Sequence, residues 1–238
     1  MQQRDAEREN RRRARDGRKG RAEPLYTEDD AQAALGLIRS VDYGRAFEVL
    51  PGVELTFRDA GHILGSASVW LRLSEGGLER RIVFSGDLGQ YDSPILRDPE
   101  PGPAADLVVM ESTYGDRLPT DRDATLAELG EILLHARMRG GNVLIPAFAV
   151  GRSQDLLYEF GTHFEAWDLA SWRIFLDSPM AIEASQVYWR HPELYDEEAR
   201  ELRGRTGTLP PLPNLTLCRS AEESMAINRI PGGAIVIA

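Results

Sequence analysis

Short apolar runs alternate with longer amphipathic segments through the second half of the chain, and this alternation restricts the fold more than any other feature. The apolar runs are NVLIPAFA, WRIFLDSP, LTLC and AIVIA, and the first is expected to be a buried strand. Before that run, apolar residues recur at helical spacing until Gly140 and Gly141 end the pattern. The apolar face of this predicted helix consists of Leu126, Leu129, Leu133 and Ala136. Strands that alternate with helices imply right-handed βαβ units, so we predict an α/β fold with a parallel sheet flanked by helices.

The first half of the chain has a different pattern, in which strands are joined by short turns. The predicted strands are VELTF, SVWLRL, RIVFSGD and DLVVMEST, and a Gly-Gly pair predicts a hairpin turn between the second and the third. Before these strands, Thr27 with Asp30 three residues later predicts a capped helix N-terminus. The pattern changes near residue 118. We therefore predict one domain over residues 1–117 and a second over residues 118–238.

Composition and charge narrow the class of protein. The 238 residues carry a formal net charge of −10, although residues 1–21 hold nine Arg and Lys against four Asp and Glu. The rest of the chain is strongly acidic, so a polyanion-binding face must be a local patch, and the basic arm is expected to be a solvated helix or a disordered arm. The one cysteine, Cys218, excludes an internal disulfide framework and is expected to be a buried strand thiol. No apolar run approaches the roughly 18 residues that a membrane helix needs, so we expect a cytoplasmic protein without a membrane partner.

Three polar side chains lie at the ends of predicted strands of the first half. His62 lies just past a strand in a glycine-rich loop, while Asp87 and Glu111 each lie at the end of a strand. A scaffold can direct side chains at strand ends towards one point, and a histidine with two carboxylates suits zinc or manganese. Each also has an ordinary structural explanation, with His62 as a satisfied polar residue, Asp87 as a turn or cap residue and Glu111 as the partner of an arginine. The remaining histidines are expected at solvated positions near helix ends: His135, His163 and His191.

Six motifs resemble, in their order, a known protein family. The motifs are FRDAGHILGSASVWL, IVFSGDLG, VVMESTYGDR, NVLIPAFAVGRSQDLLY, IFLDSPMAIEAS and PGGAIVIA. They are similar to the β-CASP branch of the metallo-β-lactamase superfamily, whose members are RNA-processing nucleases, and the resemblance covers the chain from about Leu25 to Ala238. It implies a partial metallo-β-lactamase αββα sandwich followed by a β-CASP domain.

The resemblance also implies a two-zinc hydrolase that cleaves RNA phosphodiester bonds. His62 matches the motif histidine that binds one zinc ion, and Asp87 matches the aspartate that bridges both ions. Glu111 matches the acidic residue that orients a histidine thought to protonate the leaving group. In such a site the metal ions lower the pKa of a bridging water, and the hydroxide attacks the phosphodiester. Gly151 and Arg152, at a strand-to-helix junction, are expected to hold a substrate phosphate, with an interdomain salt bridge as the equal alternative for Arg152.

Parts of the family pattern are missing from the sequence. The H-x-H-x-D-H signature and the later histidine motifs are absent, so we expect an internal piece of a longer protein. His62 and Asp87 are two ligands, whereas a stable zinc site needs three or four, so this chain is expected to bind zinc weakly and not to cut RNA. The expected partner is single-stranded RNA, while a DNA substrate, the choice between endo- and exonuclease and a homo-oligomer are left open. The alternatives are a non-catalytic RNA-binding or scaffold protein and another hydrolase of the superfamily.

Overall fold

The computed structural model describes residues 2–118, 120–207 and 210–238. Contacts between residues divide the chain into two compact units, Met1–Asp42 and Tyr43–Ala238. Among the described helices, none combines the length and the apolar character that crossing a membrane requires.

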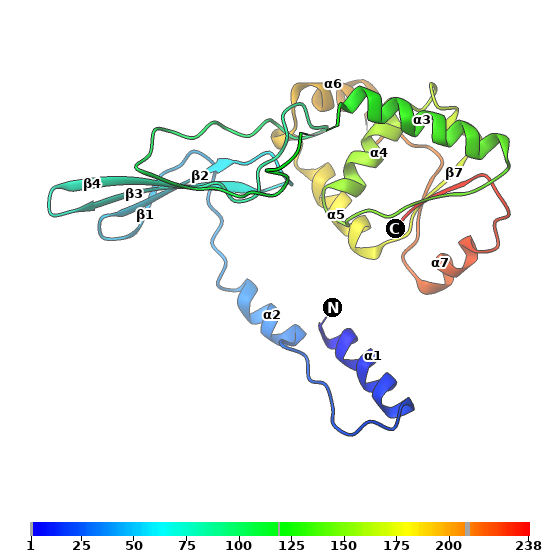
Figure 1. Cartoon of the computed structure of the whole chain (residues 1–238), viewed down its shortest axis with the longest axis horizontal. Coiled ribbons are helices and arrows are strands. Elements are labelled where there is room, and N and C mark those ends of the chain that lie inside the picture. The colour runs from blue at the N-terminus through cyan, green and yellow to red at the C-terminus, as the bar shows by residue number, and fades with distance from the viewer. Residues whose placement is uncertain (1, 119, 208–209) are drawn as a thin grey trace. The chain divides into compact units, whose positions relative to one another are not determined.

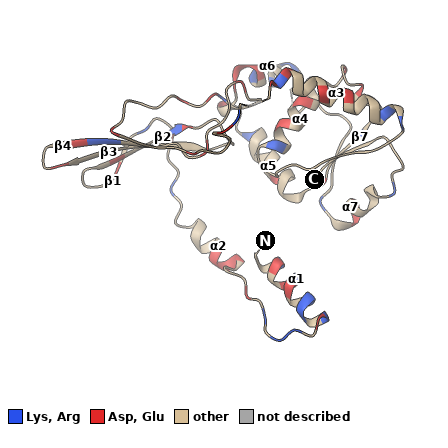
Figure 2. Ribbon diagram, viewed as in Figure 1, with Lys and Arg blue, Asp and Glu red and all other residues tan. Residues whose placement is uncertain are grey.

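The first unit contains two solvated helices, α1 (Gln2–Arg15) and α2 (Glu28–Leu35), and neither contains a buried residue (Figure 1). Asp5 lies in the first turn of α1 and three arginines lie in its last turn, an order that the helix dipole favours (Figure 2). Thr27 and Asp30 form the predicted capping box at the start of α2. The basic arm is therefore a solvated helix, which is one of the two states expected for it.

The first sheet of the second unit has five strands in the order β1-β2-β3-β4-β5. The strands are β1 (Phe47–Leu50), β2 (Val53–Asp59), β3 (Ala67–Glu75), β4 (Leu78–Phe84) and β5 (Leu107–Val109). Strands β1 to β4 pair antiparallel, whereas β5 pairs parallel to β4. Gly76 and Gly77 have φ values of +56° and +80°, which suit a tight turn between β3 and β4, so the predicted hairpin is confirmed.

The second sheet is entirely parallel, with the strand order β6-β9-β7-β8. Its strands are β6 (Val143–Ile145), β7 (Arg173–Leu176), β8 (Leu215–Leu217) and β9 (Ala234–Ile237). The helices are α3 (Arg122–Met138), α4 (Arg152–Thr162), α5 (Pro179–Arg190), α6 (Glu197–Thr206) and α7 (Ala221–Ile227), with 3₁₀ turns at Leu169–Ser171 and Pro192–Leu194. Figure 1 shows these helices around the strands of the sheet. The α/β fold with a parallel sheet is confirmed.

The main core lies around β7 and β9. All four residues of β9 are buried, and Ile235 and Ile237 pack with buried side chains of β7 and of helices α3, α4 and α5. On α3, Leu133 is fully buried and Leu126, Leu129 and Ala136 are partly buried, which confirms the predicted apolar face. Cys218 is buried directly after β8, as expected.

Strand β6 corrects one expectation, because NVLIPAFA was expected to form a buried strand. In the structure β6 has three residues and lies at the edge of the sheet, paired with β9 on one side. Leu144 at its centre is largely exposed as a result. An apolar run can belong to an edge strand as well as to a central one, and composition alone does not separate the two.

The predicted boundary near residue 118 falls in the connection between β5 and α3, and so between the two sheets. Because contacts group Tyr43–Ala238 into one unit, the division into residues 1–117 and 118–238 stays a prediction. Strand β5 lies at the edge of the first sheet, and all three of its residues are exposed.

The connection between β4 and β5 reaches into the helices that surround the second sheet. Its residue Ile95 is fully buried, and its carbonyl accepts a hydrogen bond of 2.8 Å from the backbone N–H of Asp196. The next residue, Leu96, forms an isolated β-bridge with Tyr195. The buried residues that meet here, called the tyrosine cluster below, are Ile95, Tyr158, Tyr188, Tyr195 and Ala199. This cluster joins the part of the chain that carries the first sheet to the part that carries the second.

Candidate functional site

The loop from Ala60 to Ser66, called the His62 loop below, joins β2 to β3 and is held by its own hydrogen bonds. The Ser66 hydroxyl accepts the backbone N–H groups of His62 and Ile63 at 3.1 and 3.2 Å. Gly61 has φ +60°, and a Cβ on it would lie 2.7 Å from the carbonyl oxygen of Arg97, so only glycine fits. The glycine-rich sequence around His62 therefore reflects a tightly packed turn.

Asp87 follows β4 and lies opposite His62. The distance from His62 Nε2 to Asp87 Oδ2 is 4.0 Å, and the two side chains are 43% and 74% exposed. The backbone N–H of Gly89 donates to the carbonyl of Ala60 at 2.8 Å, and a Cβ on Gly89 would overlap the Gly61 carbonyl. The loop that carries Asp87 is thus packed against the His62 loop through glycines.

Glu111 follows β5 and completes the group of residues that the sequence predicts. Its carboxylate accepts the backbone N–H of Leu88, the residue after Asp87, at 2.6 Å, and its own N–H donates to the Ser85 hydroxyl at 3.0 Å. The hydrogen bond from Leu88 lowers the pKa of Glu111, with smaller contributions from Thr113 and from the charge of His62. The partner of Glu111 is therefore a backbone amide beside Asp87, and not the arginine of the ordinary explanation.

His62 and Asp87 present one imidazole nitrogen and one carboxylate oxygen on facing loops, a donor pair that suits zinc. Within the described part of the chain, no three His, Cys, Asp or Glu side chains are grouped so as to hold a metal ion. His62 and Asp87 thus fit as two of the ligands of a metal ion.

Gly151 and Arg152 lie at the start of α4. Gly151 has φ +84°, and its N–H already donates to the Gln154 side chain at 2.7 Å. Arg152 is 68% exposed, and its guanidinium lies 3.6 Å from the carboxylate of Asp155, one turn further along the same helix. The ion pair of Arg152 is therefore local to α4, and it is not the interdomain salt bridge that was the alternative expected for Arg152 from the sequence. A Cβ on Gly151 would lie 3.1 Å from Ile63, so the start of α4 lies beside the His62 loop.

Two residues near this site carry no signal in the sequence. The Tyr188 hydroxyl accepts the backbone N–H of Leu64 at 3.0 Å, across 124 residues of sequence. Burial raises the pKa of Asp155 to about 7, although Arg152 opposes the shift. Neither residue lies in a pattern that distinguishes it from an ordinary helix residue. Of the other histidines, His135 on α3 and His191 after α5 are exposed, as expected. His163, directly after α4, is instead partly buried, because its ring stacks on Trp167 and contacts the Glu159 carbonyl at 3.0 Å.

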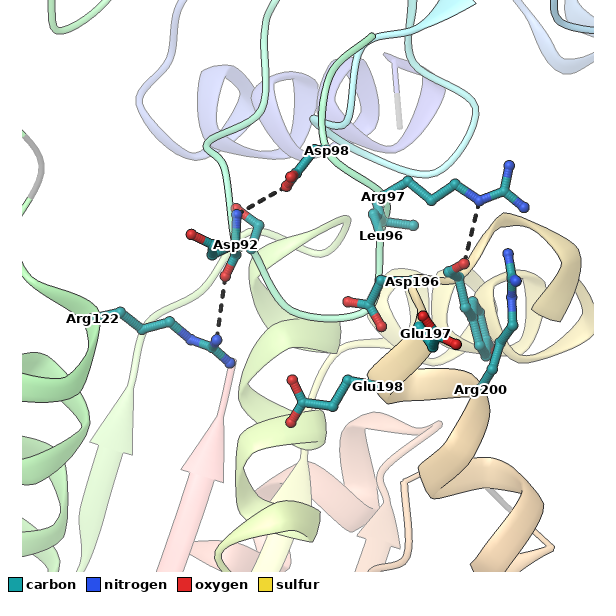
Figure 3. A pocket seen from close by; sticks show the side chains of 11 residues that line it. Asp92, Leu96, Arg97, Asp98, Arg122, Asp196, Glu197, Glu198 and Arg200 are labelled. Carbon is teal, nitrogen blue, oxygen red and sulfur yellow. Dashed lines mark hydrogen bonds between the residues drawn. The ribbon is translucent and has the colours of Figure 1, made fainter.

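A cavity of about 510 Å³ lies where the connection between β4 and β5 meets the start of α6 (Figure 3). Its charged lining consists of Asp92, Asp98, Asp196, Glu197, Glu198, Arg97, Arg122 and Arg200. Arg122 donates to the carbonyl of Asp92 at 3.2 Å and pairs with Glu159 at 2.6 Å, while Arg97 donates to the carbonyl of Tyr195 at 3.4 Å. Arg122 and Arg97 thus bind protein groups at this cavity and hold the connection between β4 and β5 in place.

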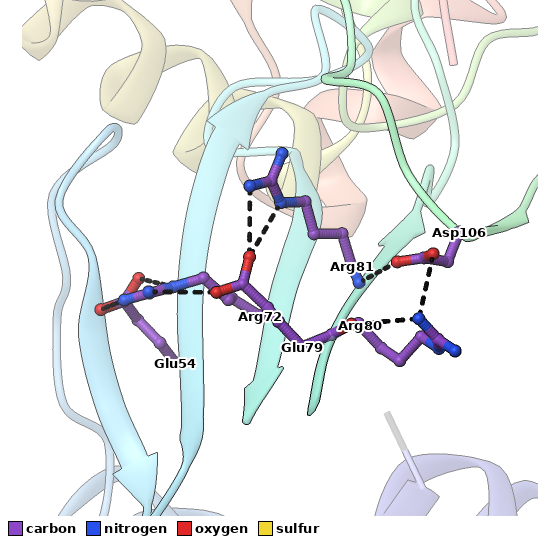
Figure 4. Close-up of polar contacts among 6 residues, drawn as sticks. All are labelled: Glu54, Arg72, Glu79, Arg80, Arg81 and Asp106. Carbon is purple, nitrogen blue, oxygen red and sulfur yellow. Dashed lines mark hydrogen bonds and ion pairs between the residues drawn. The ribbon is translucent and has the colours of Figure 1, made fainter. Parts of the chain in front are cut away.

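Strands β3 and β4 of the first sheet carry several arginines that also have protein partners (Figure 4). Arg72 on β3 binds Glu54 on β2 through two hydrogen bonds of 3.0 and 2.8 Å. Arg81 contacts Glu79 at 3.1 Å, and Arg80 lies 3.7 Å from Asp106. Each of these guanidinium groups faces a carboxylate, as Arg152 also does. Arg152 is the stronger candidate for phosphate binding because it lies at the N-terminus of α4, beside the His62 loop.

Comparisons with known proteins find one matching domain family and several similar curated proteins. Residues 153–238 match the Beta-Casp domain. The chain is 40% identical over 218 residues to Ribonuclease TTHA0252 of Thermus thermophilus, an alignment that covers 91% of this chain and 48% of the relative. It is 32% identical over 194 residues to Transcription termination factor FttA of Pyrococcus abyssi, covering 79% of this chain and 29% of that protein. The chain thus spans about half of the ribonuclease and less than a third of this termination factor.

Proposed function

The chain carries a Beta-Casp domain and is homologous to β-CASP nucleases of the metallo-β-lactamase superfamily, and on this basis we propose that the protein containing it is a metal-dependent hydrolase of RNA phosphodiester bonds. The observation that carries the proposal is the geometry at the ends of β2, β4 and β5. There His62 and Asp87 face each other at 4.0 Å, and Glu111 binds the amide of the residue after Asp87.

We assign His62 and Asp87 as metal ligands. Zinc, two ions in the complete protein, would supply Lewis-acid chemistry at these side chains and a bound water of lowered pKa. The chain's own contribution is to present the two side chains from loops that hydrogen bonds and glycine contacts hold together.

Glu111 has a positioning role in this proposal. One of its oxygens accepts the Leu88 N–H, which fixes the backbone beside Asp87. A carboxylate has further lone pairs, and these suit the ring N–H of a histidine that serves as the leaving-group acid. Its lowered pKa supports the role, because the ionised form remains an acceptor over a wider pH range.

Arg152 is proposed to hold an RNA phosphate. Its guanidinium is largely exposed and lies at the start of α4, where the helix dipole also favours an anion. The Gly151 N–H donates to Gln154, so the guanidinium carries this contact in preference to that amide. Single-stranded RNA is the proposed substrate form, because an unpaired strand can place one phosphate between the metal ligands and Arg152.

A non-catalytic RNA-binding protein is the second candidate, because the described residues offer only two metal ligands. The distinguishing experiment measures cleavage and binding of a labelled single-stranded RNA by the complete protein, with and without a chelator. His62→Ala is compared with His135→Ala, which changes an exposed histidine on α3.

The proposal predicts cleavage that the chelator stops, that added zinc or manganese restores, and that His62→Ala abolishes while His135→Ala does not. RNA binding without cleavage by the wild-type protein would favour the scaffold. Cleavage that the chelator leaves unchanged would exclude a metal-dependent hydrolase.

A further inference from the structure

A buried hydroxyl from the second half of the chain forms a hydrogen bond with the His62 loop. Tyr188 on α5 accepts the backbone N–H of Leu64 at 3.0 Å. Leu64 lies two residues after His62, and its side chain packs against the tyrosine cluster. The His62 loop is therefore bound to a helix of the second sheet at a position close to the proposed metal ligand.

Tyr188 is itself held firmly. Its side chain is 2% exposed, and its carbonyl accepts the hydroxyl of Tyr195 at 2.8 Å. Burial raises its pKa to about 12, so the hydroxyl stays neutral at physiological pH. The Leu64 N–H is partly buried, and a backbone N–H shielded from water that loses its acceptor destabilises the structure, so this N–H depends on the Tyr188 hydroxyl.

The hydrogen bonds within the loop connect Leu64 to His62. Ile63 and His62 both donate their N–H groups to the Ser66 hydroxyl, so residues 62 to 66 form one hydrogen-bonded turn. Ile63 also lies against Gly151 at the start of α4. A shift of Leu64 must therefore move the turn that carries the His62 side chain.

We propose that Tyr188 is a positioning residue for His62, through which the Beta-Casp part of the chain sets the place of a metal ligand in the first part. The inference rests on the proposed function, because it takes His62 as a metal ligand. It goes further in assigning a role in that site to a residue that contacts neither metal nor substrate.

The test compares Tyr188→Phe with Tyr195→Phe in the full chain of 238 residues. Each variant keeps its ring and removes one buried tyrosine hydroxyl of the same cluster, but only the Tyr188 hydroxyl bonds to the His62 loop. The first readout is Co²⁺ affinity, which is measured from the paramagnetic broadening of the amide signals of residues 61–66. The second is deuterium exchange of the Leu64 amide, and unfolding by urea shows that both variants fold.

Tyr188→Phe is expected to weaken Co²⁺ binding about tenfold, the lower range for removing a group that orients a ligand, and to accelerate exchange at Leu64. Tyr195→Phe is expected to lose comparable stability while keeping wild-type Co²⁺ affinity and a slowly exchanging Leu64 amide. A purely structural role predicts instead that the two variants behave alike in both readouts.

A His62→Ala variant separates failure of this inference from failure of the proposed function. If His62→Ala binds Co²⁺ as the wild type does, His62 is no ligand and both proposals are wrong. If His62→Ala loses Co²⁺ while Tyr188→Phe matches Tyr195→Phe, only the positioning role is wrong. Fast exchange of the Leu64 amide in the wild type would overturn the positioning role without any variant.

Discussion

The surroundings of two carboxylates near the His62 loop, those of Glu111 and Asp155, shift their pKa values in opposite directions. The Leu88 N–H stabilises the ionised form of Glu111 and lowers its pKa. Burial disfavours the ionised form of Asp155 and raises its pKa to about 7, even though the Arg152 guanidinium lies 3.6 Å away. Glu111 is thus a fixed charge at neutral pH, while Asp155 changes its charge near pH 7.

Asp155 should make stability depend on pH. An aspartate in the unfolded chain titrates near 3.8, whereas the folded chain holds the Asp155 proton up to about pH 7. The contribution of Asp155 is therefore fully present below pH 3.8 and is lost as pH rises to about 7. Asp155→Asn stays neutral, so its free energy of unfolding relative to wild type should rise by about 2 kcal/mol between pH 4 and pH 8. This value is smaller than the free energy that corresponds to the full pKa shift of Asp155, because solvent partly screens the side chain.

Urea unfolding at several pH values measures this difference. Asp123→Asn on α3, where the aspartate is exposed, is the matched control. A stability difference between Asp155→Asn and wild type that is equal at pH 4 and pH 8 would contradict a raised pKa at Asp155.

At the scale of elements, Ile95 is the fully buried apolar residue of the connection between β4 and β5. Ile95 is fully buried in the tyrosine cluster although its φ is +75°, a value that a β-branched residue rarely adopts. Such backbone strain costs on the order of 1–3 kcal/mol and persists where the surrounding packing outweighs it. The burial of Ile95 therefore fixes the connection in place.

Ile95→Ala should lower the free energy of unfolding by about 2–5 kcal/mol, because it removes a fully buried side chain and leaves a cavity. Ile132→Ala on α3 makes the same chemical change at a half-exposed position and should alter stability by less than about 1 kcal/mol. Urea denaturation compares the two variants. Equal losses would show that the tyrosine cluster does not anchor the connection.

Local patterns predicted most elements, and the misses have physical causes. Short strand-like runs and the Gly-Gly pair indicated β2, β3 and β4, and helical spacing ended by Gly140 and Gly141 indicated α3. Strand β1 has four residues and helix α6 is mostly polar, so neither forms a clear apolar pattern.

Within the site, His62, Asp87 and Glu111 lie together at the ends of β2, β4 and β5, as the sequence suggested. The bond between Tyr188 and Leu64 spans 124 residues, and a contact at that separation leaves no local signal.

At the scale of the whole molecule, burial is unevenly divided between the two predicted domains. Every residue of β2 is only partly buried, whereas every residue of β9 is buried. The main core cluster draws its members from residues 129–237. We therefore predict that residues 118–238 resist proteolysis longer than residues 1–117.

Limited trypsin digestion followed by mass spectrometry tests this prediction. The expected product is a persistent fragment that starts near α3 and retains β9, while fragments of the first sheet disappear early. The same digestion of Ile95→Ala serves as a comparison, because loosening the connection should expose the first sheet further. A persistent N-terminal fragment with early loss of β6 to β9 would contradict the prediction.

The central claim, that this chain supplies metal ligands to an RNA hydrolase, is tested most directly by metal content and RNA cleavage rate in the complete protein carrying Asp87→Ala or Glu111→Ala. Asp87→Ala should lose both bound metal and cleavage, because the aspartate is a proposed ligand. Glu111→Ala should keep nearly all of its metal and cleave about 10²–10⁴-fold more slowly, since its proposed role is to support the leaving-group acid. If Glu111→Ala loses metal as completely as Asp87→Ala, the two roles are wrongly assigned. If Asp87→Ala retains both its metal and its cleavage rate, the claim itself is contradicted.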